Sequence, residues 1–353
     1  MEKTSTFAVT HGRNGPYKSR SPVVSHSYKC HTMDFRTIVS LPETDVRITP
    51  RTRIMTLGSC FAEHIGRRLQ RCLPEDCLSV NPTGVLYNSG SIYNALSALA
   101  QPGNDDAEAL VFEAADGMWH HWQHSTKFVA RSREELVAMS GEGRAEARRV
   151  FRAIDVLFIT FSTDHAYYLA EGPLKGTLVA NCHKQPARMF SEAVIDPDEA
   201  FAQWHPLLHA LHSARPELCI VFTLSPYRYA KYGMHENALS KARQMLLIDR
   251  LCHACDGVSY FPAYEIITDE LRDYRFYESD MLHPSQQAVD YVWERFMQWA
   301  FTDEMKIYAR ERGQIMRDME HRPLNPDSPE HRAFKTKADE RRRLFNKKWG
   351  EAL

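Results

Sequence analysis

In the stretch Arg53–Phe61 (RIMTLGSCF), the hydrophobic pattern changes from that of a buried strand to that of a helix, and this change indicates the fold. Residues 53–57 form a short apolar run of the kind found in buried strands, and the run stops at Gly58. Beyond the glycine, apolar residues recur at helical spacing while arginines occupy the other side. The stretch therefore predicts a strand, a tight turn and a helix, with Ser59 at the junction.

The same alternation continues through the middle of the chain. Residues 155–161 (DVLFITF) and 218–224 (LCIVFTL) are continuous apolar runs, typical of strands buried on both faces. Between and after them, the patterns predict three helices and one short strand, over residues 196–214, 236–254, 285–301 and 258–261. Strands that alternate with helices predict a mostly parallel sheet covered on both sides, a three-layer α/β/α sandwich. Functional loops in such a sheet lie beyond the carboxyl ends of the strands.

Composition excludes several classes of protein. The 353 residues are 43% hydrophobic and 25% charged, which is typical of a globular chain, and the formal net charge is -1. A chain with almost no net charge is not expected to bind nucleic acid or an anionic membrane electrostatically. No apolar run approaches the ~20 residues that span a bilayer. Eight scattered cysteines without paired spacing indicate reduced thiols in a cytoplasmic protein.

Both ends of the chain differ from its middle. The N-terminal segment is polar with a single acidic residue, so we expect an unstructured leader, or a mis-assigned start with translation from Met33. The aromatic segment 109–130 has a hairpin turn at Asp116-Gly117 and is expected to be an insertion beside the sheet. The expected parts are the leader, one α/β domain and a helical C-terminal extension, over residues 1–32, 33–302 and 303–353.

Three residues have the chemistry of a serine nucleophile and its base. Ser59 follows a predicted strand, where its hydroxyl would lie beside the N–H groups of a helix start. The same position also suits an ordinary helix N-cap. A serine hydroxyl needs an adjacent base. Asp280 and His283, three apart before a predicted helix, can supply an orienting carboxylate and that base, in the order of a serine triad.

Longer motifs give the chain a family resemblance. Residues 56–63 (TLGSCFAE) resemble the signature of the GSCFA family, and further blocks of the family's type lie at residues 81–88, 181–187, 237–242 and 260–285. The resemblance extends over about residues 34–322. The family is similar to the SGNH hydrolases, a group of esterases, lipases and acyltransferases, and this implies a flavodoxin-like α/β fold.

The resemblance also implies roles for individual residues. Ser59 would be the nucleophile, His283 the general base and acid, and Asp280 the carboxylate that orients the imidazole. The oxyanion hole of SGNH enzymes combines the serine N–H, a glycine N–H and an asparagine side chain. Ser59 itself and Gly84 match the first two contributions.

The asparagine is the point at which the chain departs from the SGNH pattern. SGNH enzymes have Gly-x-Asn-Asp after the corresponding strand, whereas this chain has Ser-Thr-Asp-His at residues 162–165. The replacement donor is either the Thr163 hydroxyl or the Asn181 amide, and we favour Asn181. The alternative for Asn181 is a side-chain hydrogen bond that stabilises its own loop.

Several other residues have two possible roles. Trp119 and His120, which follow each other in the aromatic segment, either line the mouth of a pocket or cover the edge of the sheet. Tyr227 and Arg228 follow a predicted strand and either bind an anionic group of the substrate or remain solvated. Cys60 is a rival nucleophile, but two successive side chains at such a junction do not both point into the site.

Two groups of histidines or cysteines have part of a metal-binding motif, and each lacks the remaining ligands. His205, His209 and His212 share one helix face but lack the glutamate of a zinc-protease motif. Cys252 and Cys255 have no second cysteine pair. We therefore expect no metal and no cofactor.

The sequence thus predicts a serine esterase that acts on a small-molecule or carbohydrate acyl ester through an acyl-serine intermediate. Two alternatives remain open. One is an O-acyltransferase that passes the acyl group to a carbohydrate or another hydroxyl acceptor. The other is a non-catalytic ligand-binding module of the same shape, which the missing asparagine favours.

Overall fold

The computed structural model describes residues 36–101, 108–351 and 353. The chain divides into two units, residues 1–36 and 37–353. The expected leader, residues 1–32, lies outside the described residues. The second unit holds all the helices and strands described for the protein.

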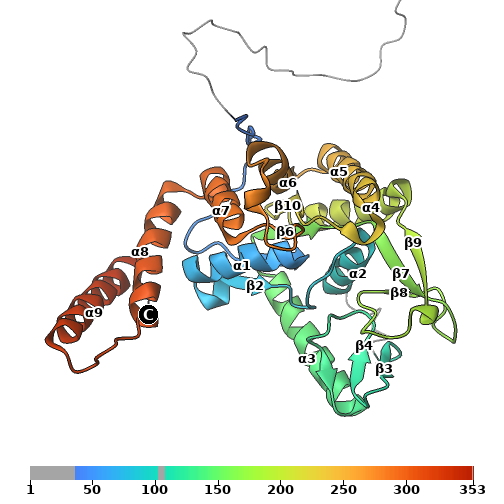
Figure 1. Ribbon diagram of the computed structural model, residues 1–353, viewed down its shortest axis with the longest axis horizontal. Helices are drawn as coiled ribbons and strands as arrows, with labels where there is room; N and C mark the ends of the chain where they lie inside the picture. The colour runs from blue at the N-terminus through green and yellow to red at the C-terminus, as the bar shows by residue number, and fades with distance from the viewer. Residues whose placement is uncertain (1–35, 102–107, 352) are drawn as a thin grey trace, which may run out of the picture. The chain divides into compact units, whose positions relative to one another are not determined.

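The core of the second unit is a parallel sheet of five strands (Figure 1). Its spatial order is β2–β1–β6–β10–β11, which is the flavodoxin-like order 2-1-3-4-5 when the strands are counted along the chain. The predicted α/β fold with a mostly parallel sheet is therefore confirmed. The strands are β1 (Ile54–Gly58), β2 (Leu78–Val80), β6 (Val156–Phe161), β10 (Cys219–Leu224) and β11 (Val258–Tyr260).

Helices cover both faces of this sheet (Figure 1). Alternate strand residues point to opposite sides, so Ile54 of β1 packs into one apolar core and its neighbour Met55 into the other. The first core is shared with α1 (Cys60–Cys72), α7 (Gln286–Ala300) and α8 (Asp303–Glu320). The second is shared with α2 (Ser89–Ala100), α3 (Arg133–Phe151), α4 (Pro197–Ala214) and α5 (Met234–Ala254). The three-layer arrangement matches the sequence prediction.

Capping side chains explain where the helices begin. The Asp196 carboxylate accepts hydrogen bonds from two N–H groups in the first turn of α4, and the Ser285 hydroxyl accepts one from the N–H of Ala288 in α7. Both helices therefore start one residue after their predicted starts. α5 begins two residues earlier than predicted, after Gly233, whose φ of 88° favours glycine.

Two small antiparallel sheets lie outside the central one. Segment 109–130 contains β3 (Val111–Glu113), β4 (Trp119–His121) and β5 (Val129–Ala130), and Gly117 has a φ of 78° in the turn between the first two. The other sheet was not predicted and has the order β8–β7–β9. Its strands are β7 (His165–Leu169), β8 (Leu178–Val179) and β9 (Phe190–Val194).

The remaining elements are short turns and a C-terminal helix. Single 3₁₀ turns occur at Glu75–Cys77, Ala187–Met189, Ala230–Tyr232 and Tyr274–Phe276, and α6 (Ala263–Glu265) continues into a π turn at Ile266–Glu270. After α8, the chain ends in α9 (Pro329–Trp349), which packs against α8 through Phe345 and Trp349 on Tyr308. Among the described helices, none has both the length and the apolar character needed to cross a bilayer.

Candidate active site

Ser59 lies where β1 ends and α1 begins. It is buried and caps α1, and its Oγ accepts a hydrogen bond from the N–H of Phe61 at 3.3 Å. Gly58 has a φ of 136°, and a Cβ there would lie 2.3 Å from the carbonyl oxygen of Thr160 on β6. Only glycine allows this approach. The N-cap expected as the ordinary alternative is thus present, and it places the hydroxyl at the carboxyl edge of the sheet.

Asp280 and His283 form a hydrogen-bonded pair in the loop before α7. The Asp280 Oδ2 lies 2.5 Å from Nδ1 of His283. The Asp280 Oδ1 accepts the N–H groups of Leu282 and His283 at 2.8 and 3.0 Å. The bond to the imidazole, followed by these backbone bonds, lowers the pKa of Asp280 to about 2. The carboxylate is therefore ionised at neutral pH and holds the imidazole with Nε2 free to act as a base.

Hydrogen bonds from Glu278 and from Arg228 hold the loop that carries His283. The N–H of Glu278 donates to the carbonyl of His283 at 2.8 Å. Arg228 donates from its guanidinium to the carbonyl of Met281 at 2.9 Å and from its backbone to that of Leu282 at 3.0 Å. Arg228, which we expected either to bind an anionic substrate group or to remain solvated, is not among the residues that line the pocket. Its guanidinium instead holds the histidine loop.

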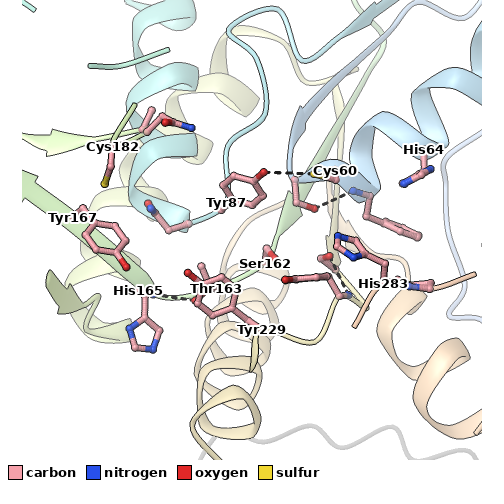
Figure 2. A pocket seen from close by; sticks show the side chains of 18 of the residues that line it. Cys60, His64, Tyr87, Ser162, Thr163, His165, Tyr167, Cys182, Tyr229 and His283 are labelled. Atoms are coloured by element: carbon pink, nitrogen blue, oxygen red, sulfur yellow. Dashed lines mark hydrogen bonds between the residues drawn. The ribbon is translucent and has the colours of Figure 1, made fainter. Parts of the chain in front are cut away.

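One pocket brings Ser59 and His283 together although they lie far apart in the sequence. The cavity has a volume of about 300 Å³. Figure 2 shows Cys60 and His283 at one end and Tyr167 and Cys182 at the other. No hydrogen bond joins Ser59 to His283 among the described residues, although the Ser59 hydroxyl, which accepts the N–H of Phe61, can still donate its own proton. Apolar and aromatic groups make up much of the wall, including Phe61, Tyr87, Val179, Ala180, Tyr227, Tyr229 and Val289.

The expected oxyanion donors occupy different places. The N–H of Gly84 donates to the carbonyl of Asn81 at 2.8 Å, and Gly84 does not line the pocket. Its φ is 85°, and a Cβ at this position would lie 1.9 Å from Ser125 Oγ, so the turn requires glycine. Gly84 therefore serves this turn and supplies no donor to the pocket. Thr163 and Asn181 do line the pocket. Their side-chain oxygens accept the N–H groups of His165 and His183 at 3.2 and 2.7 Å.

Tyr227 is the member of the expected substrate-binding set that lines the pocket, and its ring centre lies 4.4 Å from that of His283. Trp119 and His120 lie on β4 and are not among the pocket-lining residues. The His120 ring packs 4.8 Å from that of His183 and 5.7 Å from that of Phe112. His120 thus packs between the insertion and the loop that carries His183.

The histidine and cysteine groups give no metal site in the part of the chain that the structure describes. Cys252 and Cys255 are free thiols on and beside the end of α5. Burial raises the pKa of Cys252 to about 12, so this thiol stays protonated and unreactive at neutral pH.

Lys241 on α5 is a buried residue near the site that the sequence analysis missed. Its Nζ donates to the carbonyl oxygens of Ser162 and Ser225 at 2.6 and 2.8 Å, and both serines line the pocket. The Lys241 amino group thus joins the chain beyond β6 to the chain beyond β10. Its sequence spacing to Ile248 and Leu251 on the buried face of α5 was a signal that could have revealed it.

Replacing Lys241 by methionine tests this link. Burial lowers the pKa of Lys241 from 10.5 to about 7, so between these pH values the unfolded chain holds a proton that the folded chain lacks. The free energy of unfolding of the wild type should therefore rise with pH across this window. Lys241→Met should lose that rise, and at pH 9 its free energy of unfolding should be lower by about 2–4 kcal/mol because two buried carbonyls lose their donor.

Urea unfolding at pH 6, 7.5 and 9 measures both effects. Lys306→Met is the matched control, because Lys306 is a half-exposed lysine on α8 that pairs with Asp303. This control should keep the pH dependence of the wild type. A Lys241→Met protein that also kept it would contradict the assignment.

Fold and site together define an α/β protein with a flavodoxin-like strand order and a serine, histidine and aspartate at the carboxyl edge of its sheet. The chain belongs to the GSCFA family, whose model matches residues 53–296. A second model, described as the C-terminal domain of GSCFA domain proteins, matches residues 313–349. The family resemblance inferred from the sequence motifs is thereby confirmed.

Two solved structures are similar to this chain at low identity. One, provisionally described as a platelet activating factor from Streptococcus pneumonia, has 12% identity and a TM-score of 0.34, with 71% of this chain and 85% of that chain covered. The other is a carbohydrate esterase family 3 protein from Talaromyces cellulolyticus, with 7% identity, a TM-score of 0.30, and 69% and 94% covered. A comparison with curated proteins finds no match.

Proposed function

We propose that the protein is a serine ester hydrolase in which Ser59 is the nucleophile, His283 the general base and acid, and Asp280 the orienting carboxylate. The observation that carries the proposal is that Ser59 and His283 line one pocket while His283 Nδ1 is bonded to an ionised Asp280. An acyl transfer needs this combination of nucleophile, base and orienting group.

The reaction follows from these roles. Ser59 Oγ attacks the ester carbonyl carbon while His283 Nε2 takes the hydroxyl proton, and a tetrahedral adduct forms. The adduct collapses, the C–O bond to the alcohol breaks, and the imidazolium returns the proton to the departing oxygen. Water then attacks the acyl-serine with the same base, which releases the carboxylic acid and restores Ser59.

The substrate class is a small-molecule or carbohydrate acyl ester. A cavity of about 300 Å³ with aromatic and aliphatic walls can enclose an acyl group and part of its alcohol. If an acceptor alcohol reaches the acyl-serine in place of water, the same residues perform O-acyl transfer. Product analysis with sugar acceptors separates hydrolysis from transfer.

A non-catalytic binding module is the second candidate. Two observations favour it: Ser59 Oγ bonds to Phe61 and not to His283, and the N–H of Gly84 is used within its own turn. This candidate predicts a Ser59 with no more reactivity than a surface serine.

Labelling with a fluorophosphonate probe decides between the two candidates. We expect the folded wild type to be labelled on Ser59, because the probe reports a serine activated by an adjacent base. Mass spectrometry of the labelled peptide identifies the residue, and heat-unfolded protein and Ser59→Ala are the controls. A folded wild type that takes up no label, or takes it up at Cys60, would exclude the proposed mechanism.

A further inference from the structure

The end of the pocket opposite His283 is formed by the small sheet of β7, β8 and β9. β7 contributes Tyr167 to the wall, and β8 contributes Val179, which is paired with Tyr167 in the register of the two strands. Figure 2 places Tyr167 and Cys182 at this end of the pocket, and Cys60 and His283 at the other. The small sheet therefore determines what can fill the pocket beyond the reacting ester.

A chain of hydrogen bonds fixes the direction of the Tyr167 hydroxyl. Lys231 donates from Nζ to the Tyr167 oxygen, and the Tyr232 hydroxyl donates to the Glu192 carboxylate. The two phenol oxygens lie 2.6 Å apart. Because the single hydroxyl proton of Tyr232 is used on Glu192, Tyr167 must donate its own proton to Tyr232. One lone pair of the Tyr167 oxygen then remains, so this phenol offers a ligand an acceptor and no donor.

The ionic groups behind Tyr167 offset each other. Nζ of Lys231 lies 3.6 Å from a Glu192 carboxylate oxygen. It also lies 4.8 and 4.6 Å from the ring centres of Tyr167 and Tyr232. Because the ammonium is already paired, a ligand carboxylate would gain little here, and it has no proton to give to Tyr167. A neutral hydroxyl, which brings a proton, suits this wall.

The chemistry at Ser59 determines which part of the ester reaches this end. His283 returns its proton to the departing alcohol, so the alcohol must leave on the side of His283. The acyl group then extends the other way, toward Tyr167. The cavity of about 300 Å³ is about twice the size of an engineered ~150 Å³ cavity that binds benzene, so an acetyl group would leave most of it empty. Tyr87 and Tyr229 also line the pocket, and aromatic walls favour an aromatic ligand.

We propose that the pocket binds an aromatic acyl group with a hydroxyl at its far end, and that this hydroxyl donates a hydrogen bond to the Tyr167 oxygen. The 4-hydroxybenzoyl and 4-hydroxycinnamoyl groups are acyl groups of this class. The inference rests on the proposed function, because an acyl group occupies the pocket in this way only if Ser59 attacks its ester. It specifies the acyl part of the substrate.

Three p-nitrophenyl esters test the inference. The 4-hydroxycinnamate can donate to Tyr167, whereas the cinnamate and the 4-methoxycinnamate cannot. At pH 6.5, after subtraction of the uncatalysed rate, we expect kcat/KM of the wild type to be about tenfold higher for the hydroxy ester than for the other two, which is the effect of one hydrogen bond. Tyr167→Phe should bring these ratios close to one. A merely structural role of Tyr167 would lower all three values together and leave the ratios unchanged.

Tyr168→Phe is the matched control. Tyr168 follows Tyr167 on β7, where successive side chains point to opposite faces, and it is not among the residues that line the pocket. This variant should keep the ratios of the wild type. If Tyr167→Phe does not fold, Glu192→Gln provides a second test. Its amide can donate to Tyr232, so the chain of donors can reverse. Tyr167 can then donate to either oxygen, and the hydroxy ester should lose its advantage over the methoxy ester. Thermal unfolding of each variant reports whether the fold is retained.

The acyl assignment and the proposed function fail in distinguishable ways. Suppose that the wild type hydrolyses p-nitrophenyl acetate and Ser59→Ala does not. The acyl assignment alone is then overturned if kcat/KM is higher for the acetate than for the hydroxy ester, or if the three cinnamates are hydrolysed alike. A tenfold preference that persists in folded Tyr167→Phe would overturn it as well. If the folded wild type takes up no fluorophosphonate label, both the triad and the acyl assignment are overturned.

Discussion

A Ser59→Ala protein is expected to hydrolyse p-nitrophenyl acetate with a kcat about 10⁵-fold below that of the wild type, a loss of the size seen when the nucleophile of a serine hydrolase is removed. The alanine also removes the oxygen that accepts the Phe61 N–H, so α1 loses its cap at a cost of about 1 kcal/mol in the free energy of unfolding. The fold survives such a loss. Steady-state rates and a melting curve on the same sample separate the two effects.

Cys60→Ala is the matched control for Ser59→Ala. Cys60 lines the same pocket and follows Ser59 directly, so a nonspecific disturbance of the junction would affect both variants. We expect Cys60→Ala to keep kcat within about tenfold, because the one hydrogen bond of its thiol within the described residues is to the Tyr87 hydroxyl. An active Ser59→Ala protein together with an inactive Cys60→Ala protein would assign the nucleophile to the cysteine.

Asp280→Asn is expected to lower kcat about 10³–10⁴-fold, because an amide in place of the carboxylate favours the wrong imidazole tautomer. Asp273→Asn is the matched control: its carboxylate also caps a turn in the same loop region and makes no recorded contact with His283 among the described residues. It should keep kcat within about threefold. Equal activities of the two variants would contradict the orienting role.

The pH dependence of the wild type supplies an independent check on Asp280. Its pKa is lowered to about 2, so the carboxylate stays ionised from neutral pH down to about pH 3. The orienting bond is lost only as the pH falls through this folded-state pKa. Any loss of activity between pH 5 and 7 must therefore have an origin other than protonation of Asp280, and a pH–rate profile of the wild type from pH 3 to 7 checks this.

The central strands were predictable because burial on both faces leaves a continuous apolar run. β1, β6 and β10 are such runs, and each was placed within one residue of its start. β2 has three half-buried residues with no distinctive pattern, and β7 (HAYYL) is neither a continuous apolar run nor an alternation of polar and apolar residues. These stretches become strands because they pair with segments that are distant in the sequence, and no local pattern encodes that pairing.

The site was predictable where its chemistry lies in short motifs. Ser59, Asp280 and His283 are recognisable by residue type and spacing, and the parallel sheet explains how Ser59 and His283 reach one pocket. The role of Arg228 depends on carbonyl groups beyond position 280, which only the folded chain brings to it. Sequence reasoning could not assign such long-range backbone partners.

Lys241 was missed for a related reason. It looks like a surface lysine until its burial under two pocket loops is known. The two carbonyl groups that accept its hydrogen bonds lie far from it in the sequence, so the sequence alone does not reveal the link.

Under the proposed mechanism, the positions of β1 and of the histidine loop determine when the protein can become active. Ser59 follows the first strand of the sheet, while Asp280 and His283 follow the last one, β11. During synthesis, the ribosome makes Ser59 early and His283 late. A nascent chain therefore contains a serine without its base until the final strand of the sheet has emerged and docked. Chains that end at a premature stop codon between Ser59 and Asp280 would lack the base and would therefore be inactive as esterases. Two separately expressed halves, divided at the exposed Gly172 turn after β7, would regain esterase activity only on reassociation, which makes the protein a natural candidate for a split reporter.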